Sequence, residues 1–379
     1  MKSVWTIAFV MGMIATPTLA APVALTDGQL NAVAAGVHFT ITNLVADEAG
    51  VAPTTDPLLL NPWGLSQAPG GPLWVANNHS GTSTLYDKDT FAKLGLVVEI
   101  PAPGGGVGAP TGTVFSGLTG SDFIIDQGDK AGHSIFLFAT EDGTIVGWNP
   151  TVDQTHGMIA VDASARGANY KGLAIAGENE GRRIFAADFA NNAVDMFDGG
   201  FNSAGSFTDA TLPEGYAPFN VQALNGEIYV AFAKQGPGGD ELAGPGLGFI
   251  DVFDRQGHLL RRLVSNGELN APWGLTIAPD SFAKFAGALL VGNFGDGRIN
   301  AYDPESGKFL GTLSSKGEDP LEIDGLWALH RGPEGAVVFS AGTNGEQNGL
   351  IGAINRSSRA ASWAFQQHIP AATMTSGTH

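Results

Sequence analysis

The sequence predicts an all-β fold, a single six-bladed β-propeller whose blades are four-stranded antiparallel sheets. The first observation is residues 270–313, where four short apolar runs are separated by Gly, Pro, Asp and Asn, as in a four-stranded meander. The second is that the opening of this segment, Asn-Ala-Pro-Trp-Gly-Leu, recurs in degraded form along the chain. One such sheet cannot bury both of its faces, whereas six sheets around an axis can. The six openings begin at Asn61, Pro110, Tyr170, Pro218, Asn270 and Ile323.

The N-terminal residues have the three parts of a secretory signal peptide. Lys2 supplies the positive charge, Val4 to Ala15 form the apolar run, and Ala20 and Ala21 are small residues at the expected cleavage site. We expect cleavage after Ala20 or Ala21, which assigns residues 1–20 to the signal peptide and predicts a periplasmic or secreted protein. A retained anchor is the alternative, but the run is shorter than the roughly 20 residues that a membrane span needs. No later segment is expected to span a bilayer.

Residues 21–37 show no period and are interpreted as a linker. His38 to Val45 then has the composition of a strand, and its spacing to Trp63 resembles that from the fourth blade's outer strand to Trp273. We therefore expect this N-terminal strand to complete the sixth blade, which closes the ring and removes an unpaired edge. The propeller then occupies residues 38–355, and residues 356–379, which lack the repeat, form a C-terminal tail.

The apolar runs after each opening predict the strands of the blades in order. Inner strands are nearly all apolar, as burial on both faces requires. In blade two, Phe123 to Asp126 is one strand too many, which indicates an inserted hairpin or a different register. The expected strands are 63–68, 73–78, 82–87 and 94–100 in blade one; 111–115, 134–140, 144–149 and 158–161 in blade two; 172–176, 184–188, 193–198 and one near 207 in blade three; 220–224, 228–234, 249–254 and 258–264 in blade four; 270–279, 288–293, 297–303 and 308–313 in blade five; and 326–330, 337–340 and 350–354 in blade six.

Charge and composition exclude several functions. The formal net charge is −18, and an acidic protein repels phosphates, so we expect no nucleic-acid partner. The chain has no cysteine, which excludes thiol chemistry and Cys-ligated metals and means that the fold does not depend on disulfides. The acidity either attracts divalent cations and cationic ligands or serves solubility alone.

The repeat resembles known propellers. The Pro-x-Gly-Leu opening is followed by Leu-x-Val-Ala-Asn at 73–77 or Phe-Ala-Ala-Asp at 185–188, and then by Ile-x-x-Phe-Asp at 250–254. This order is similar to NHL-repeat propellers and, more distantly, to gluconolactonase-type calcium propellers. Residues 141–149 together with 170–173 resemble a family of exported bacterial propellers whose function is unassigned. The resemblance covers about residues 38–355, and it implies a fold but no reaction.

In propellers of this type, the starts of the inner strands and the turns between second and third strands meet around the channel mouth. Lys171 and Asp324 come from blades three apart, so we expect them to face each other across the axis as an ion pair. Alternatively they hold the two ends of a polar ligand that stacks on aromatic rings, or the aromatic residues plug the channel and the charges are solvated. The expected ring is Trp63, Thr111, Lys171, Phe219, Trp273 and Asp324, and the candidate ligand-binding residues are Trp63, Lys171, Phe219, Trp273, Asp324, Asn77 and His79.

Oxygen ligands at strand ends allow a second function. A hard cation such as Ca²⁺ takes carboxylates and amide carbonyls, and the resemblance to gluconolactonase-type enzymes implies a metal-dependent hydrolase or lactonase whose metal polarises a lactone carbonyl. Trp or Lys precedes Gly-Leu where that family has Asn, and the ammonium of Lys171 opposes a divalent ion, which weakens this prediction. The alternative is that these side chains form only turn hydrogen bonds. The candidate metal ligands are Glu141, Asp188, Asn220, Asn293 and Asp324.

A long Gly/Pro loop, Gln235 to Gly246, interrupts the fourth blade. Loops of this length are more often functional than tight turns, so we expect a cover or a partner-docking arm beside the mouth. No H-x-H, H-E-x-x-H, G-x-S-x-G or P-loop pattern occurs in the sequence. The sequence therefore predicts an exported propeller that binds a small ligand or a protein partner at the channel mouth, with the metal-dependent hydrolase as the alternative.

Overall fold

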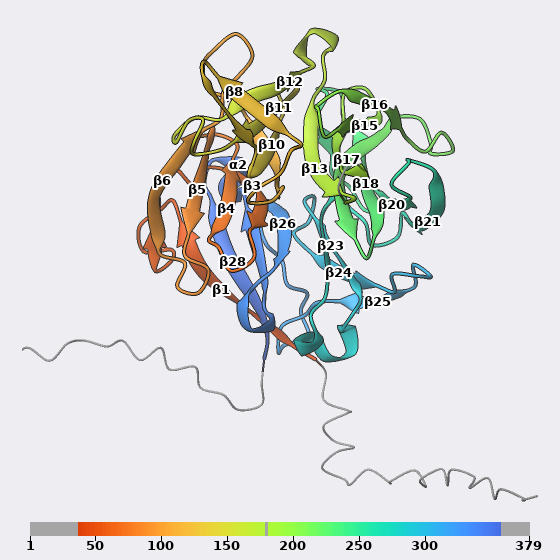
Figure 1. Ribbon diagram of the computed structural model, residues 1–379. Coiled ribbons are helices and arrows are strands. Elements are labelled where there is room, and N and C mark those ends of the chain that lie inside the picture. The colour runs from red at the N-terminus through yellow and green to blue at the C-terminus, as the bar shows by residue number, and fades with distance from the viewer. Residues whose placement is uncertain (1–36, 179–180, 358–379) are drawn as a thin grey trace, which may run out of the picture. The chain divides into compact units, whose positions relative to one another are not determined.

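Strands β1 to β28 form six sheets of four or five strands and one two-stranded hairpin, and the six sheets are the blades of a propeller (Figure 1). The computed structural model describes residues 37–178 and 181–357. This architecture confirms the predicted fold class. The predicted signal peptide lies outside the described residues, as do the linker and the C-terminal tail except for their inner ends at residues 37, 356 and 357.

The first three blades follow one another along the chain. Blade two contains the extra hairpin that the sequence indicated, β8 (Ile124–Gln127) and β9 (Lys130–His133), between its first and second strands. The blades are β3 (Pro62–Gln67), β4 (Leu73–Asn77), β5 (Thr82–Tyr86) and β6 (Lys93–Glu99); β7 (Pro110–Phe115), β10 (Phe136–Thr140), β11 (Thr144–Trp148) and β12 (Met158–Asp162); and β13 (Tyr170–Ala176), β14 (Arg183–Asp188), β15 (Ala193–Asp198) and β16 (Ser203–Phe207).

The last three blades differ more from one another. Blade four carries the short strand β19 (Glu241–Leu242) beside β18, and blade six carries β2 (Thr54–Thr55) beside β1. The blades are β17 (Tyr216–Leu224), β18 (Glu227–Gln235), β20 (Phe249–Phe253) and β21 (Leu259–Ser265); β22 (Pro272–Ile277), β23 (Leu289–Asn293), β24 (Ile299–Tyr302) and β25 (Phe309–Thr312); and β26 (Leu326–Arg331), β27 (Val337–Ala341), β28 (Leu350–Arg356) and β1 (Phe39–Ala46). Short helical turns are η1 (Ser164–Arg166), η3 (Asp280–Phe285), η4 (Pro333–Gly335) and α2 (Thr343–Glu346).

The ring is closed by pairing the two ends of the propeller, as the sequence predicted. β1 runs antiparallel to β28, from the pair Phe39 and Arg356 to the pair Ala46 and Leu350. Phe39 is 1% exposed and packs on Phe282, with ring centroids 4.8 Å apart, so β1 also contacts η3 of blade five. The N-terminal strand therefore completes one blade and fastens it to its neighbour.

Glycines in the inner strands allow adjacent blades to approach closely. A Cβ atom on Gly64 would lie 2.5 Å from the carbonyl oxygen of Thr111, and one on Gly274 would lie 2.7 Å from that of Trp327. A Cβ on Gly172 would overlap the side chain of Asn220 in the next blade. The recurring Gly of the x-Gly-Leu opening is therefore required because neighbouring backbones meet there.

The expected register of blade six is wrong by three residues. In blades one and five the residue before the ring position pairs with the end of the second strand, as Pro62 does with Asn77 and Pro272 with Asn293. In blade six this partner is Leu326, so Trp327 and not Asp324 occupies the ring. Gly325, which suggested the other register, has φ +65° and forms a turn against Gly342.

Candidate functional site

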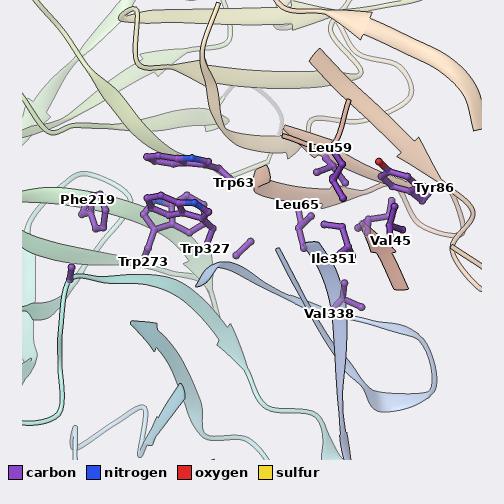
Figure 2. Packing of buried hydrophobic residues seen from close by; sticks show 14 of the residues in the cluster. Val45, Leu59, Trp63, Leu65, Tyr86, Phe219, Trp273, Trp327, Val338 and Ile351 are labelled. Carbon is purple, nitrogen blue, oxygen red and sulfur yellow. The ribbon is translucent and has the colours of Figure 1, made fainter. Parts of the chain in front are cut away.

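Aromatic side chains close the channel beneath its mouth. The ring positions hold Trp63, Thr111, Lys171, Phe219, Trp273 and Trp327. Trp63 stacks on Trp327 with ring centroids 3.6 Å apart, and Trp273 meets both rings edge-on (Figure 2). Phe219 packs against Trp327 at 5.9 Å, and Phe294 stacks on it at 4.2 Å. The aromatic residues pack together as one of the alternatives expected, but the other half of that alternative, solvated charges, is wrong for Lys171, whose side chain is 3% exposed. Trp327 is the member that sequence reasoning missed.

The packed rings of Trp63, Phe219, Trp273, Phe294 and Trp327 are called the floor of the mouth below. The N–H groups of its three tryptophans are not equivalent. Trp273 donates to the backbone carbonyl of Lys171 at 2.9 Å, and Trp327 donates to Oδ1 of Asn61 at 2.9 Å. Trp63 is 2% exposed, and its Nε1–H has no acceptor among the described residues. A buried donor without a partner costs about 1–3 kcal/mol, so this group marks a point where the floor is incomplete.

Lys171 lies on the floor with its ammonium group among rings and carboxylates. Its side chain is only 3% exposed, and Nζ is 5.3 Å from the ring centroid of Trp63, 5.6 Å from Phe189 and 5.9 Å from Phe219. Nζ also lies 3.0 Å from Oε1 of Glu141. A desolvated cation over an aromatic ring gains about 2 kcal/mol. The prediction that Lys171 points into the mouth is thus matched by the structure, although its partners are not the expected one.

The loop from Gln235 to Gly246, hereafter the arm, brings two further carboxylates to Lys171. Oε2 of Glu241 lies 3.3 Å from Nζ of Lys171, and Oδ1 of Asp240 lies 3.5 Å from it. The Glu241 side chain is 8% exposed, whereas that of Asp240 is 78% exposed. Glu241 is therefore the buried partner, and it covers the lysine from the arm.

Burial and charge act against each other in this cluster. Burial alone would lower the pKa of Lys171, but the charges of Glu241 and Glu141 outweigh burial and hold that pKa above its ordinary value of 10.5. Burial raises the pKa of Glu241 above 4.5, although Lys171 opposes the rise. The lysine is therefore charged, whereas desolvation destabilises the charged form of Glu241.

A third glutamate reaches the mouth from α2. Asn344, Gly345 and Glu346 all have positive φ, at 57°, 61° and 66°, so α2 contains consecutive left-handed residues. The left-handed conformation costs about 1–2 kcal/mol at a residue other than Gly, and such strain is found most often at functional sites. Oε2 of Glu346 accepts a hydrogen bond from Asn61 at 2.7 Å, and Asn61 also contacts Nε2 of His79 at 3.4 Å.

Burial is the main cause that raises the pKa of Glu346, and the charge of Glu141 adds to it. Glu346 in turn raises the pKa of Glu241. The channel mouth therefore holds three interacting glutamates around one lysine. His79 borders this cluster through Asn61, but Asn77 does not, because its amide donates to Thr82 and Thr84 within its own blade.

Three of the five predicted metal ligands each bind a different protein group and do not contact one another. Asp188 forms an ion pair with Arg166 at 3.0 Å. Asn220 donates to the carbonyl of Trp273 at 2.7 Å and thereby links blades four and five. Asn293 donates to a backbone carbonyl at 2.8 Å, and its own Oδ1 is buried without a partner among the described residues.

The other two predicted ligands do not complete a cation site. Glu141 faces the ammonium group of Lys171, and the positive charge of that group would repel a divalent cation. Asp324 is exposed and accepts a hydrogen bond from the backbone N–H of Asn344 at 2.8 Å, so it does not face Lys171 across the axis. Within residues 37–178 and 181–357, no three His, Cys, Asp or Glu side chains are grouped as metal ligands. The residues present do not fit the calcium site that the resemblance implied.

A serine, a histidine and an aspartate also converge at the base of the inserted hairpin. Oγ of Ser116 is 3.3 Å from Nε2 of His133, and Nδ1 of His133 is 3.2 Å from Oδ1 of Asp122. Ser116 is 2% exposed, and its hydroxyl donates to the carbonyl of Ser134. Because Ser116 is buried and its hydroxyl is hydrogen-bonded to a backbone carbonyl, this trio fastens the base of the hairpin.

The channel below the floor holds too little space for a ligand. A cavity of about 30 Å³ lies there, bounded by Gly64, Thr113, Asn220, Trp273 and Ala328 among others. Since a water molecule needs about 10–15 Å³ on this measure, the cavity accommodates one or two waters. A larger ligand does not fit in this cavity.

No protein-family model matches the sequence. The chain is 32% identical over 328 residues to the uncharacterized protein R648 of Acanthamoeba polyphaga mimivirus, covering 83% of this chain and 80% of R648. It is also 32% identical over 328 residues to the uncharacterized protein L690 of the same virus, covering 83% of this chain and 85% of L690. Among solved structures, virginiamycin B lyase from Staphylococcus aureus has 10% identity and a TM-score of 0.50, covering 84% of this chain and 99% of that chain. At that identity the likeness shows the fold alone.

Proposed function

The chain belongs to the family of the mimivirus proteins R648 and L690, and we propose that it binds a small molecule at the channel mouth with Lys171 as the anchor. The observation that supports this proposal is the burial of a charged lysine between three aromatic rings and two glutamates. Taking an ion out of water costs several kcal/mol, and an apolar side chain of similar volume often serves stability as well or better. A plug that only closed the channel would gain nothing from a lysine.

The strained turn of α2 supports the same location. Glu346 keeps a left-handed backbone that places its carboxylate beside Asn61 and His79, close to the other two glutamates. Local strain and perturbed ionisation at one concave end of a fold are features of binding and catalytic sites. The strained turn and the buried lysine come from different blades and meet at the same place.

A thermal-shift screen tests the proposal. The probes are millimolar acetate, benzoate, benzamide, benzylamine, glucose and gluconate, and a probe at 100 times its Kd stabilises a protein by about 2.7 kcal/mol, or about 4 °C for a chain of this size. We expect at least one probe to stabilise the parent and to lose its effect in the double variant Lys171→Met, Glu241→Gln, which removes both charges of the pair.

The matched control is Lys234→Met. Lys234 contacts the carbonyl of Glu214 and the ring of Tyr216 instead of the floor, so the same exchange should leave the stabilisation intact. A parent that no probe stabilises, or an effect that the double variant retains, would count against the site.

A protein partner docking on the mouth remains part of the prediction, and so does export. In the part of the chain that the structure describes, no helix combines the length and apolarity that crossing a membrane takes. We propose that the protein acts in the periplasm or after secretion, because its first residues form a signal-peptide pattern. Recovery of the protein in the periplasmic fraction tests this proposal.

The calcium-dependent hydrolase or lactonase stays a prediction without support from the geometry. Its candidate ligands have other partners, and the cation nearest to Glu141 is Lys171. Metal analysis of protein purified without chelators tests it directly, since one tightly held Ca²⁺ per chain would favour the enzyme.

A further inference from the structure

Glu241 is a carboxylate of the arm that contacts the ammonium group of Lys171 directly. Its Oε2 lies 3.3 Å from Nζ, and it reaches the lysine from the arm and not from the ring of inner strands that forms the floor. Asp240, the other carboxylate of the arm, lies 3.5 Å from Nζ, whereas Glu141 belongs to the turn after β10 and is held by Asn78 at 3.0 Å. One carboxylate of the lysine is thus fixed by the blades, and the other two are delivered by a separate segment.

The arm can leave without disrupting blade four. β18 pairs with β20 from Ile228 to Phe232, so the four main strands are complete without β19. Apart from its contacts with Lys171, the middle of the arm is attached through the β18 pairs of Leu242 and Glu241 and through a hydrogen bond of 2.6 Å from Gly244 N–H to Asn270. At its two ends, Gln235 donates to the carbonyl of Phe189 at 2.6 Å and Gly246 accepts from Asn266 at 2.7 Å. Segments with few buried apolar contacts open at low free-energy cost.

The floor offers a second donor for an incoming acceptor. Nε1–H of Trp63 is buried and has no acceptor among the described residues, and Nζ of Lys171 lies over the same ring. The ammonium group and the indole N–H are both donors, and a carboxylate accepts two or more hydrogen bonds. The pair of donors matches an anion better than a cation.

The surrounding charge does not oppose this exchange. When the arm opens, Asp240 and Glu241 leave the lysine together, so two negative charges are withdrawn before one enters. Burial already disfavours the charged form of Glu241. When Glu241 moves into water, its carboxylate regains hydration, which offsets part of the free energy lost with the Lys171 contact.

We infer that the ligand carries a carboxylate that replaces Glu241 on Lys171 while the rings of Trp63, Phe189 and Phe219 contact its apolar part. This inference rests on the proposed function and names its ligand class as a small organic carboxylate. Glu241 then acts as an internal competitor that holds the arm closed until the ligand arrives.

Calorimetric titration with three matched probes tests the inference. Benzoate carries the carboxylate on a flat ring, benzamide has nearly the same shape without charge, and benzylamine carries the opposite charge. We expect benzoate to bind at least about fivefold more tightly to Glu241→Gln than to the parent, as typical coupling between competing groups requires. Glu214→Gln, which makes the same exchange at an exposed position outside the lysine cluster, should change the affinity by about twofold or less.

The outcomes separate this inference from the proposed function. Benzoate binding that tightens in Glu241→Gln and disappears in the double variant Lys171→Met, Glu241→Gln supports both. Binding of benzylamine or benzamide in preference to benzoate, lost in the same double variant, overturns the carboxylate assignment but supports a ligand site at the mouth. Failure of all three probes with both the parent and Glu241→Gln counts against the carboxylate and, together with a negative thermal screen, against the site itself.

Discussion

Replacing Lys171 by Met would leave Glu141 and Glu241 beside the aromatic floor without their cation. The Glu241 side chain is 8% exposed, so water solvates its charge poorly, whereas Glu141 is 26% exposed and keeps its hydrogen bond from Asn78. Removing one partner of a buried pair costs about 3–5 kcal/mol, and we expect Lys171→Met to lower the free energy of unfolding by this amount near pH 8. Glu241→Gln leaves Lys171 with Glu141 at 3.0 Å, so its cost should be near that of one charged hydrogen bond, about 1.5–3 kcal/mol.

The pH dependence of the Lys171→Met variant follows from the pKa of Glu241. Burial raises this pKa above 4.5 and Lys171 opposes the rise, so removing the lysine raises it further. A carboxyl group whose folded pKa exceeds its unfolded pKa binds more protons when folded, and its ionisation destabilises the fold as pH rises above about 4.5. Lys171 itself is charged at pH 5 and pH 8, since its pKa lies above 10.5. The loss caused by Lys171→Met should therefore be larger at pH 8 than at pH 5.

Denaturant unfolding of the parent, both single variants and the double variant at pH 5 and pH 8 measures these quantities. The double variant should cost about 0.5–3 kcal/mol less than the sum of the single variants, because the two residues share one interaction. Lys234→Met is the control and should stay within about 0.5–1 kcal/mol of the parent. A Lys171→Met loss below about 1 kcal/mol at pH 8, or an equal loss at both pH values, would refute the reasoning.

Three further predictions concern the rest of the chain. Phe39→Ala should cost about 3–5 kcal/mol of the free energy of unfolding and lower the Tm by about 4–8 °C in a thermal melt. The control Phe309→Ala, at a side chain 41% exposed, should shift the Tm little. Equal melting of Phe39→Ala and the parent would contradict the role of Phe39 in fastening blade six to blade five. Burial raises the pKa of Asp251 from 3.8 to about 7, so its ionisation destabilises the fold as pH rises from 3.8 towards 7. Since Asn resembles the neutral acid, the stability advantage of Asp251→Asn over the parent should grow from pH 5 to pH 8 in denaturant titrations, and a constant difference would show that Asp251 does not titrate in this way. N-terminal sequencing of exported protein should begin after Ala20 or Ala21, and a chain that still began at Met1 would contradict cleavage.

The number of blades, the extra hairpin and the closing strand could be predicted because each depends on local patterns. Strand composition and turn residues repeat in the sequence, and the strand at 38–45 keeps the spacing of its counterparts. The register of blade six could not be predicted, because glycine serves two purposes in this fold. Gly274 is needed where two backbones meet, while Gly325 is needed for a left-handed turn. The sequence shows the same residue in both cases. In blade six, the position after the ring residue, which is Gly274 in blade five, is Ala328, so the glycine at 325 indicated the wrong register.

Only the part of the site that follows the repeat could be predicted. Lys171 and the tryptophans at 63 and 273 follow the repeat, so their place at the mouth could be inferred from it. Glu241 and Glu346 lie in irregular segments, where backbone torsions and not periodicity decide the direction of a side chain. Their approach to Lys171 from separate loops left no sequence signal.

The pairing of β1 with β28 also affects the order in which the protein folds. Thr40 and Asn355 are hydrogen-bonded although they lie 315 positions apart, so this joint is among the most distant contacts of the chain. During synthesis β1 emerges first and has no partner until the end of the propeller has been made, which places closure of the ring late in folding. Interactions that form after the transition state slow unfolding more than they speed folding. We therefore expect β1 to determine the lifetime of the folded ring and to have little influence on the rate at which the ring forms.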